Sequence, residues 1–464
     1  MNRLQAPAII ILVLAFWPNF TSLDAAETSW MCAAGSVAIT PQDPVWMGGY
    51  AARKEPSAGS VHDLNAKVLV IRDEQGEQLI IVTLDLLGIT KELRIAVEER
   101  VLAQGVSPNS LLLNASHTHC GPELRDDRIL RYGIDATYAA SARAYVHSTA
   151  IKIGNLITET LQRLEPANLY YSRARAGFAM NRRLPTEQGF INSPNPKGPI
   201  DHDVPVLRVE NAQGKLTAVL FGYACHATTL SFQKLCGDYP GFAQQYIEAK
   251  HEGVTALFLN GCSADQNPYP RRTLELAKQH GQALANGVET ALTTKQYRKL
   301  HGPLLVEMGH ATLDFKVPSI QQINEEANSD NKYTRVHGEE LLRQIETRGR
   351  IDSSHSDFPI QVAQFGADLT LVAICGEVVV DYSLRLKQEL GQDDHLVWVA
   401  GYSNHVFGYL PSLRVLREGG YEGGGAMQYT TYPGPFEATV EERVIEKIRE
   451  LHRKIQSKRT TSQR

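Results

Sequence analysis

The stretch that decides how this chain folds and what it binds is Leu111-Leu112-Leu113-Asn114-Ala115-Ser116-His117-Thr118-His119-Cys120-Gly121-Pro122. An apolar run predicts a buried strand, and two histidines follow it, one residue apart. Side chains at i and i+2 of an extended strand point to the same side, so His117 and His119 would project together beyond the strand end. Zinc binds imidazole nitrogen, and a catalytic zinc site needs about three protein ligands with one open position. The pair therefore predicts a metal site that is completed from elsewhere in the chain.

The composition is that of an ordinary globular protein. The chain has 464 residues, of which 43% are hydrophobic and 21% charged, and its formal net charge is −4. This length is compatible with one large domain or with two closely packed ones. Neither the composition nor the charge indicates a nucleic-acid partner, which usually requires a basic patch.

The first 26 residues have the pattern of a secretory signal peptide. Arg3 precedes the apolar stretch Ala8 to Trp17, and the small residues Ala25 and Ala26 follow. Ten apolar residues are too few to span a bilayer, and no later segment approaches a spanning length. We expect an exported protein, periplasmic or secreted; the alternative is a short membrane anchor.

Apolar strand patterns alternate with amphipathic helix patterns along the chain, which predicts an α/β protein. The expected strands are 66–71, 79–84, 110–116, 204–209, 216–223, 255–260, 304–310, 359–363, 369–375 and 396–401. The expected helices are 91–102, 136–164, 241–251, 274–293, 338–347, 382–390 and 436–457. The Pro- and Gly-rich segments 188–199 and 421–425 are predicted to be loops.

Polar clusters follow several of these predicted strands. Asp85, His226 and Glu377 each lie at or just after the end of an apolar run, and so does the segment Asn260 to Pro268. Ligand sites in open α/β sheets lie outside the strand ends, so the repeated pattern favours one shared site. For any single residue the alternative is simpler, because a histidine after a strand is more often a hydrogen-bonded core or surface residue.

Six cysteines, at positions 32, 120, 225, 236, 262 and 375, lack the CxxC spacing of a structural zinc ribbon. An even number in an exported chain permits disulfides, and buried free thiols are the alternative. The spacing assigns no pairing.

Several short motifs occur together in an order that resembles a known family. They are HTHCGP at 117–122, CHATTL from 225, GDYPG at 237–241, GEVVVDYSLRLK from 376, GYSNHVFGYL from 401 and GGYEGG from 419. Together they resemble the catalytic N-terminal domain of the neutral ceramidases, from Trp46 onward. The resemblance implies mixed β-sheets with flanking helices, in a hydrolase domain over 27–457 followed by a polar tail at 458–464. No segment here matches the immunoglobulin-like domain that follows in full neutral ceramidases.

The resemblance also implies the site. In this family one zinc ion per chain is held by residues that correspond here to His117, His226, Glu377 and Tyr409. The second histidine of the motif, His119, faces the substrate carbonyl. Two further substrate contacts, an arginine of an Asn-Arg pair and a tyrosine of a Tyr-Glu pair, correspond to Arg182 and Tyr421.

The sequence departs from the family pattern at Asn267, which is expected in the catalytic site. Neutral ceramidases have an essential serine in a Gly-Asp-x-Ser-Pro segment, and the matching segment here is Ala264-Asp265-Gln266-Asn267-Pro268. An asparagine amide donates and accepts hydrogen bonds but cannot serve as a nucleophile or base. Ser263 lies nearby as a substitute, and the alternative role of Asp265 is to cap a loop or helix.

The implied reaction is hydrolysis of an N-acyl amide by zinc-activated water, since zinc lowers the pKa of bound water toward about 7. Donors such as Arg182, His119 and Tyr421 would stabilise the oxyanion. The expected partner is a small-molecule or lipid N-acyl substrate, such as a sphingolipid, with transient contact to a membrane surface. Two alternatives stay open: a zinc hydrolase of another ester or amide on the same scaffold, and a binding protein without turnover.

Overall fold

The computed structural model describes residues 30–391 and 395–462. The predicted signal peptide at 1–26 lies outside these residues. Among the helices of the described part, none combines the length and the apolar character that crossing a bilayer requires. The six cysteines are all buried and unpaired, so the structure contains no disulfide among them.

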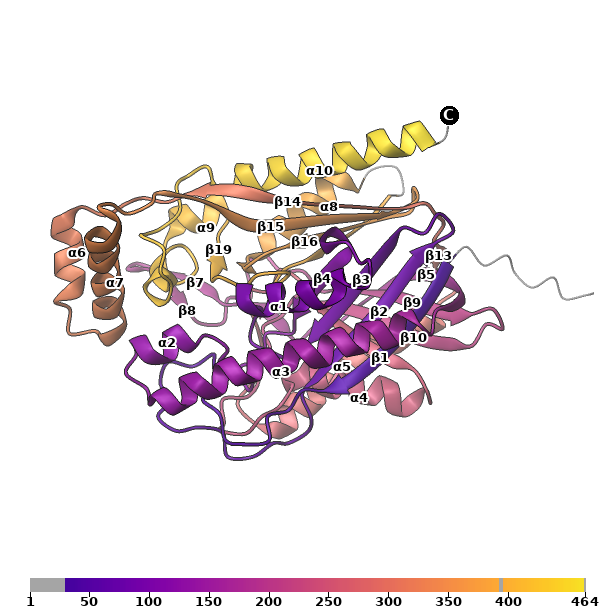
Figure 1. The fold of residues 1–464 in the computed structure, drawn as a ribbon, viewed down its shortest axis with the longest axis horizontal. Helices are drawn as coiled ribbons and strands as arrows, with labels where there is room; N and C mark the ends of the chain where they lie inside the picture. Colours follow the sequence, from indigo (N-terminus) through magenta and orange to yellow (C-terminus); the bar gives the residue numbers. More distant parts are fainter. Residues whose placement is uncertain (1–29, 392–394, 463–464) are drawn as a thin grey trace, which may run out of the picture.

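A nine-stranded sheet forms the larger half of the fold (Figure 1). Its strands run in the order β11-β10-β9-β5-β1-β2-β3-β4, and β13 pairs with β5. The pairs β3–β4 and β10–β11 are parallel and the others are antiparallel, which makes the sheet mixed. The bounds are β1 Trp30–Ala38, β2 Asn65–Asp73, β3 Gln78–Leu84, β4 Leu111–Ala115, β5 Glu165–Arg175, β9 Asp203–Asn211, β10 Leu216–Tyr223, β11 Thr255–Asn260 and β13 Arg298–Lys299.

A second sheet of four strands packs on the first. Its order is β14 (Leu304–Asp314), β15 (Ser354–Phe365), β16 (Leu369–Ile374) and β18 (Leu396–Ala400), with only β16–β18 parallel. Alternate strand residues face opposite sides of a sheet. Leu69, Ile81 and Leu112 of the large sheet accordingly share one buried cluster with Phe365 and Leu371 of the small sheet. The two sheets therefore bury their facing sides against each other.

Helices cover both outer faces. On the large sheet, α1 and α3 pack over β2 to β4, while α4 and α5 pack over β9 to β11. On the small sheet, α8 and α10 form the cover, and Figure 1 shows α10 lying along β14 and β15. The layers are thus helix, sheet, sheet, helix. The bounds are α1 Lys91–Leu102, α3 Ala136–Leu161, α4 Asp238–Lys250, α5 Leu274–Thr293, α8 Val380–Leu390 and α10 Val440–Ser462.

Shorter elements gather at one end of the layers. Three paired segments join loops there: β6 (Ala179–Asn181) with β12 (Gln266–Pro268), β7 (Arg183–Thr186) with β8 (Gly189–Asn192), and β17 (Glu377–Val378) with β19 (Tyr409–Leu410). The remaining helices are α2 Asp126–Arg131, α6 Ile320–Ala327, α7 Lys332–Arg348, α9 Leu413–Glu418, η1 Pro108–Ser110 and η2 Gly425–Tyr429. The hairpin of α6 and α7 projects at the left of Figure 1, and α7 contacts η2.

The expected α/β class with mixed sheets is confirmed, and all ten predicted strands and seven predicted helices exist, with shifts of several residues at some ends. Two predictions were wrong in detail. The segment 188–199 is not loop throughout, because β8 pairs with β7 across a two-residue turn at Glu187-Gln188, after which Gly189 begins β8 with a φ of +111°. The last helix ends at Ser462 instead of Ser457, so it takes in most of the predicted polar tail.

Candidate metal and catalytic centre

The predicted site residues lie where strand ends of both sheets meet. His117 and His119 follow β4, His226 follows β10, and Glu377 begins β17 shortly after β16. The side chain of Asn114 joins these ends. Its amide nitrogen donates to the carbonyl of Gly401 at 2.7 Å, and its oxygen accepts from the backbone N–H of Asn260 at 2.8 Å.

The rings of His117 and His226 are oriented by backbone carbonyls. Nδ1 of His117 lies 2.6 Å from the oxygen of Leu87, and Nδ1 of His226 lies 2.7 Å from the oxygen of Ser263. A carbonyl only accepts, so each Nδ1 donates its proton to that oxygen, and each Nε2 is the nitrogen left to face the cluster. Metal-ligating histidines are usually held in this way. His117 reaches its position with a φ of +62°, a strained conformation for a residue with a side chain.

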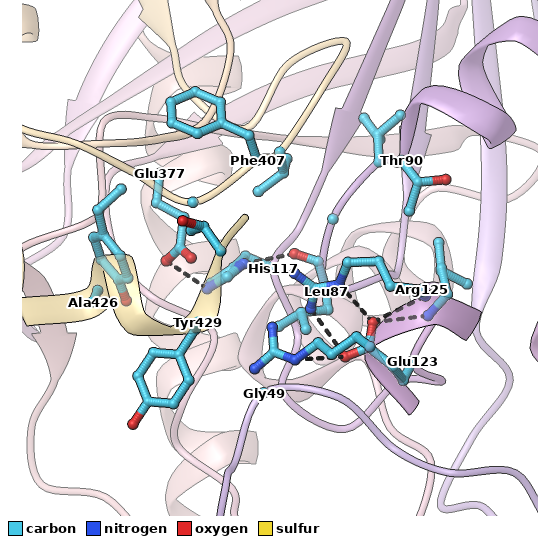
Figure 2. A pocket seen from close by; sticks show the side chains of 18 of the residues that line it. Gly49, Leu87, Thr90, His117, Glu123, Arg125, Glu377, Phe407, Ala426 and Tyr429 are labelled. Atoms are coloured by element: carbon cyan, nitrogen blue, oxygen red, sulfur yellow. Dashed lines mark hydrogen bonds and ion pairs between the residues drawn. The ribbon is translucent and has the colours of Figure 1, made fainter. Parts of the chain in front are cut away.

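Glu377 lies next to both rings, and Figure 2 shows it beside His117. Its Oε2 is 3.1 Å from Nε2 of His117 and 3.4 Å from Nε2 of His226. Two ligands about 2.0–2.1 Å from one tetrahedral zinc lie roughly 3.3 Å apart. This oxygen is buried without a hydrogen-bond partner in the described structure. A cation that binds this oxygen would compensate for the missing hydrogen bond, so the set of donor atoms fits a zinc ion.

His119 belongs to the same cluster. Its Nε2 is 3.1 Å from Nε2 of His117, and one nitrogen from each of His117, His119 and His226 lies within 4.8 Å of the others. The backbone oxygen of His119 accepts from Arg53 Nη2 at 2.6 Å. The His119 ring packs tightly against Gly49, since a Cβ added at Gly49 would come 2.5 Å from Cγ of the ring. The geometry thus offers five donors in this cluster: three imidazoles, Glu377 and, beside His226, Tyr409.

Arg182 links Tyr409 to the rest of the site. Its Nη2 donates to the Tyr409 hydroxyl at 2.9 Å, and that hydroxyl lies 3.4 Å from Nε2 of His226. Its Nε donates to Glu422 at 2.8 Å, and Arg183 donates to the second oxygen of Glu422 at 2.7 Å. Glu422 therefore holds two buried guanidinium groups, a role that the sequence analysis did not assign to it.

Asn267 is completely buried beside Arg182. Its Oδ1 accepts from Arg182 Nη1 at 3.3 Å and from the Thr228 hydroxyl at 3.1 Å, while its Nδ2 has no partner in the described structure. Asp265, in the same segment, accepts from the backbone N–H of Val380 at 2.9 Å and from Asn181 at 3.1 Å. Since Val380 begins α8, Asp265 supports a helix terminus, as its alternative role in the sequence analysis suggested.

Tyr421 is the most exposed of the predicted site residues, at 36%. Its ring lies edge-on to that of Tyr409 with 5.1 Å between centroids, and the Arg182 guanidinium lies 5.9 Å from its centroid. Burial raises the pKa of its hydroxyl, so it stays protonated at neutral pH and can donate a hydrogen bond.

Charge within the cluster is biased toward neutral rings at His119 and His226 and toward an ionised carboxylate at Glu377. Burial lowers the pKa of His226 to about 3, with a further contribution from Arg182. Burial, followed by His117 and His226, also holds the pKa of His119 well below its usual value. For Glu377, burial acts upward, but the imidazoles of His117 and His226 hold its pKa well below the usual range. Metal ligation requires these protonation states.

A cavity of about 80 Å³ opens beside the cluster, and His117, His119, Glu377, Tyr409 and Tyr421 all line it. Figure 2 shows His117 between Glu377 on one side and the ion pair of Glu123 and Arg125 on the other. The structure thus brings together all eight residues predicted from the sequence. The charged wall at Glu123, Arg125 and Arg128 was not predicted, although Glu123 follows the HTHCGP motif directly.

Comparison with known families identifies the chain. Residues 33–279, just over half of its length, match the model of the neutral/alkaline non-lysosomal ceramidase N-terminal domain. The chain belongs to the neutral ceramidase family. The predicted family is therefore confirmed, and the matched range contains the positions of His117, His119, Arg182, His226 and Asn267.

The curated relatives are neutral ceramidases of low sequence identity. Neutral ceramidase 1 of Arabidopsis thaliana is 23% identical over 270 residues, which are 55% of this chain and 34% of that protein. Neutral ceramidase B of Dictyostelium discoideum is 26% identical over 243 residues, 49% of this chain and 33% of that protein. The matches thus span about a third of the length of these relatives.

The similarity in fold to neutral ceramidases covers most of the chain. The crystal structure of neutral ceramidase from Pseudomonas aeruginosa superposes with a TM-score of 0.68 at 18% identity, covering 89% of this chain and 72% of that one. A structure titled "Ceramidase complexed with C2" gives the same TM-score and identity and is covered to 73%. The ceramidase fold therefore includes regions beyond residue 279, where Glu377, Tyr409 and Tyr421 lie.

Proposed function

We propose that this chain is a zinc-dependent hydrolase that cleaves the amide bond of N-acyl compounds, as its membership of the neutral ceramidase family suggests. The observation that carries the proposal is the spacing around Glu377. Its Oε2 lies 3.1 and 3.4 Å from the Nε2 atoms of His117 and His226, whose Nδ1 atoms are held by carbonyls. Buried donors at these separations without an ion would be an unfavourable arrangement to maintain.

His117, His226, Glu377 and Tyr409 would hold one zinc ion, and His119 would face the substrate. A zinc ion bound there would supply Lewis acidity and would lower the pKa of a water molecule toward neutrality. The other steps depend on residues of the chain. Since its pKa is depressed, His119 is neutral at pH 7 and has a ring nitrogen free to accept a proton. It returns that proton to the leaving amine, which completes the cleavage of the carbon–nitrogen bond.

Arg182 and Tyr421 are the proposed donors to the oxyanion that develops on the substrate carbonyl. The guanidinium of Arg182 is fixed by Glu422 and by Asn267, and it is permanently charged. Loss of one such preorganised donor usually raises the barrier by about 2.7–4 kcal/mol. In this scheme Asn267 positions Arg182 and performs no proton transfer, so the absence of a serine does not remove a required base.

A second candidate is a ligand-binding protein that retains the metal cluster without turnover. The observation in its favour is Asn267, which is wholly buried and hydrogen-bonded to Arg182 at the position of the family serine. A third is hydrolysis of another ester or amide on the same scaffold.

Metal analysis and substrate assays together separate these candidates. We expect about one zinc ion per chain in purified protein, loss of activity with a chelator, and recovery with added zinc. Release of fatty acid from N-acyl amines, including a ceramide, and from matched O-acyl esters would then distinguish amidase from esterase. A metal-loaded protein that hydrolyses neither class would support the binding protein. Undiminished activity in His117→Ala would refute the metal assignment.

We also propose that the chain is exported, as residues 1–26 suggest. Fractionation of cells expressing the full sequence tests this, with loss of export expected when Leu12 and Leu14 within the apolar stretch are replaced by charged residues.

A further inference from the structure

The wall of the cavity beside the metal cluster carries a buried carboxylate that is already satisfied. Glu123 is 6% exposed, and its Oε1 accepts from the backbone N–H groups of Leu124 and Arg125 at 3.1 Å each. The Arg125 side chain adds two bonds, Nε to Oε1 at 2.7 Å and Nη2 to Oε2 at 2.9 Å. Arg125 therefore compensates the charge of Glu123 through a two-point contact.

Arg128 is a second cation on the same wall, and Glu123 does not satisfy its hydrogen-bond donors. The nearest approach of its Nε to Oε2 of Glu123 is 3.8 Å, which is beyond hydrogen-bond distance. Across residues 30–391 and 395–462, its guanidinium makes no hydrogen bond, although its side chain is only 20% exposed. The wall thus carries one carboxylate and two guanidinium groups, which leaves it with one net positive charge.

Aromatic rings hold the guanidinium of Arg128 in place. It lies 5.4 Å from the ring centroid of Tyr132 and 5.7 Å from that of Tyr429. Tyr333 of α7 contacts both rings, and its hydroxyl donates to the oxygen of Ala51. Stacking on ring faces leaves the N–H groups at the edge of the guanidinium plane available to a ligand.

Arg128 also lies between two cavities. It lines the cavity that contains His117 and Glu377, and it lines a neighbouring cavity of about 500 Å³ next to Tyr132 and Tyr333. The charged groups of the larger cavity are also predominantly basic. They are the cations Arg53, Lys54, Arg128 and Lys332 and the acids Glu123 and Asp135.

We propose that Arg128 binds an anionic group of the substrate, so that the favoured substrates are N-acyl amides with a carboxylate, such as N-acyl amino acids. The inference rests on the proposed amidase function and narrows its substrate class. An arginine fork binds a carboxylate in a planar two-point contact, and partial burial strengthens the interaction. Burial and the neighbouring Arg125 already lower the pKa of Arg128, and a bound anion would relieve that unfavourable charge. A neutral ceramide offers no such partner.

A pair of matched substrates tests this. N-lauroylglycine and N-lauroylethanolamine have the same acyl chain and similar size, but only the first has a carboxylate. We expect zinc-loaded wild-type protein to show at least a tenfold higher kcat/KM for N-lauroylglycine. Arg128→Gln should lower this ratio by tenfold or more, and Arg128→Lys should retain the greater part of it. Arg131, on the same helix and paired with Asp127 at 2.9 Å, provides the control, since Arg131→Gln should leave the ratio unchanged.

Direct binding separates a failure of this inference from a failure of the amidase proposal. If neither amide is hydrolysed, calorimetry with N-lauroylglycine decides. Binding at least tenfold tighter to wild type than to Arg128→Gln would support the anion site in a protein that is not an amidase. An unchanged substrate ratio in Arg128→Gln, or equal affinity in the absence of turnover, would overturn the assignment. Thermal unfolding and zinc content of each variant verify that it is folded.

Discussion

Oε2 of Glu377 lies 3.1 Å from Nε2 of His117, although the two residues follow strands of different sheets, β16 and β4, and come from distant parts of the chain. The loop after β4 brings the histidine, and the short pair β17–β19 brings the glutamate together with Tyr409. A carboxylate that is buried between two imidazoles and has no hydrogen-bond partner among the described residues is costly unless a cation joins them. Binding of the proposed metal therefore depends on how the two sheets pack against each other.

Glu377→Gln tests this coupling. The substitution keeps the shape of the side chain but removes its charge, so zinc affinity should fall by at least about 100-fold, more than is usual for a residue that only supports a ligand. Competition with a chromogenic chelator measures the affinity. Glu389→Gln is the control, since Glu389 of α8 pairs with Arg385 of the same helix and with Arg449 of α10, and its substitution should leave zinc binding unaltered. Equal zinc affinity in Glu377→Gln and wild type would exclude the carboxylate as a ligand.

Gly49 offers a way to decide whether His119 binds metal or substrate. Gly49 and Gly59 both have φ near +90°, but a Cβ at Gly49 would collide with the His119 ring, whereas none of the described atoms lies within 4 Å of one at Gly59. Both Ala variants therefore share a backbone strain of about 1–2 kcal/mol, and only Gly49→Ala displaces the ring. We expect Gly49→Ala to lose at least tenfold in kcat with one zinc ion per chain retained, and Gly59→Ala to keep both. Loss of zinc in Gly49→Ala alone would make His119 a ligand.

The sequence predicted the parts of the fold that have strong periodicity. The helices Lys91–Leu102 and Leu274–Thr293 and the strands Leu216–Tyr223 and Thr255–Asn260 have the predicted bounds. It missed β1, whose WMCAAGSVA pattern is weakly apolar at alternate positions, and β5, in which a buried and a half-buried tyrosine precede two arginines. Both strands are stabilised by neighbours on each side in the sheet, and this tertiary support cannot be read from local pattern.

For the site, local pattern indicated only the histidine pair and the strand-end residues. Tyr409 and Tyr421 were proposed through family resemblance, since nothing in their own sequence surroundings distinguishes them from core or surface tyrosines. Glu422 and Arg128 were missed for a related reason. Glu422 contacts Arg182 and Arg128 contacts Tyr429, and both partners are distant in the sequence. A single sequence contains no signal for such contacts.

The ion pair at Glu123 predicts a pH effect on stability. Burial alone would raise the pKa of this carboxyl, but Arg125 and Arg128 outweigh it and lower the pKa to about 2 from an ordinary 4.5. Between these values the unfolded chain binds more protons than the folded chain, so the stabilisation is complete above pH 4.5 and is lost as pH falls toward 2. The contribution is on the order of 3 kcal/mol. Urea unfolding between pH 3 and 5.5 should show a flatter dependence in Glu123→Gln, and an unchanged slope would contradict the assignment.

Asn267 is the residue on which the substrate question depends. If it only positions Arg182, the acceptor oxygen is the feature that matters, because Oδ1 receives both Arg182 and the Thr228 hydroxyl. Asn267→Ala removes that oxygen and leaves two buried donors unpaired, so kcat should fall by roughly tenfold or more while zinc content and KM change little. Asn267→Asp retains the acceptor and should recover most of kcat, although a second buried carboxylate on Arg182, which already pairs with Glu422, will cost stability.

Asn267→Ser separates positioning from a direct role in catalysis. A serine hydroxyl also accepts a hydrogen bond, but its shorter side chain would not reach Arg182 and Thr228 together. If Asn267 positions Arg182, the serine variant should resemble Asn267→Ala on the amide that wild type prefers. If instead the family serine has chemistry of its own, the serine variant will hydrolyse ceramide faster than wild type does. The ratio of ceramide turnover to N-lauroylglycine turnover, measured in Asn267→Ser and Asn267→Ala, distinguishes the two cases. A selective gain on ceramide in Asn267→Ser would show that Asn267 lowers the activity of this site on ceramide.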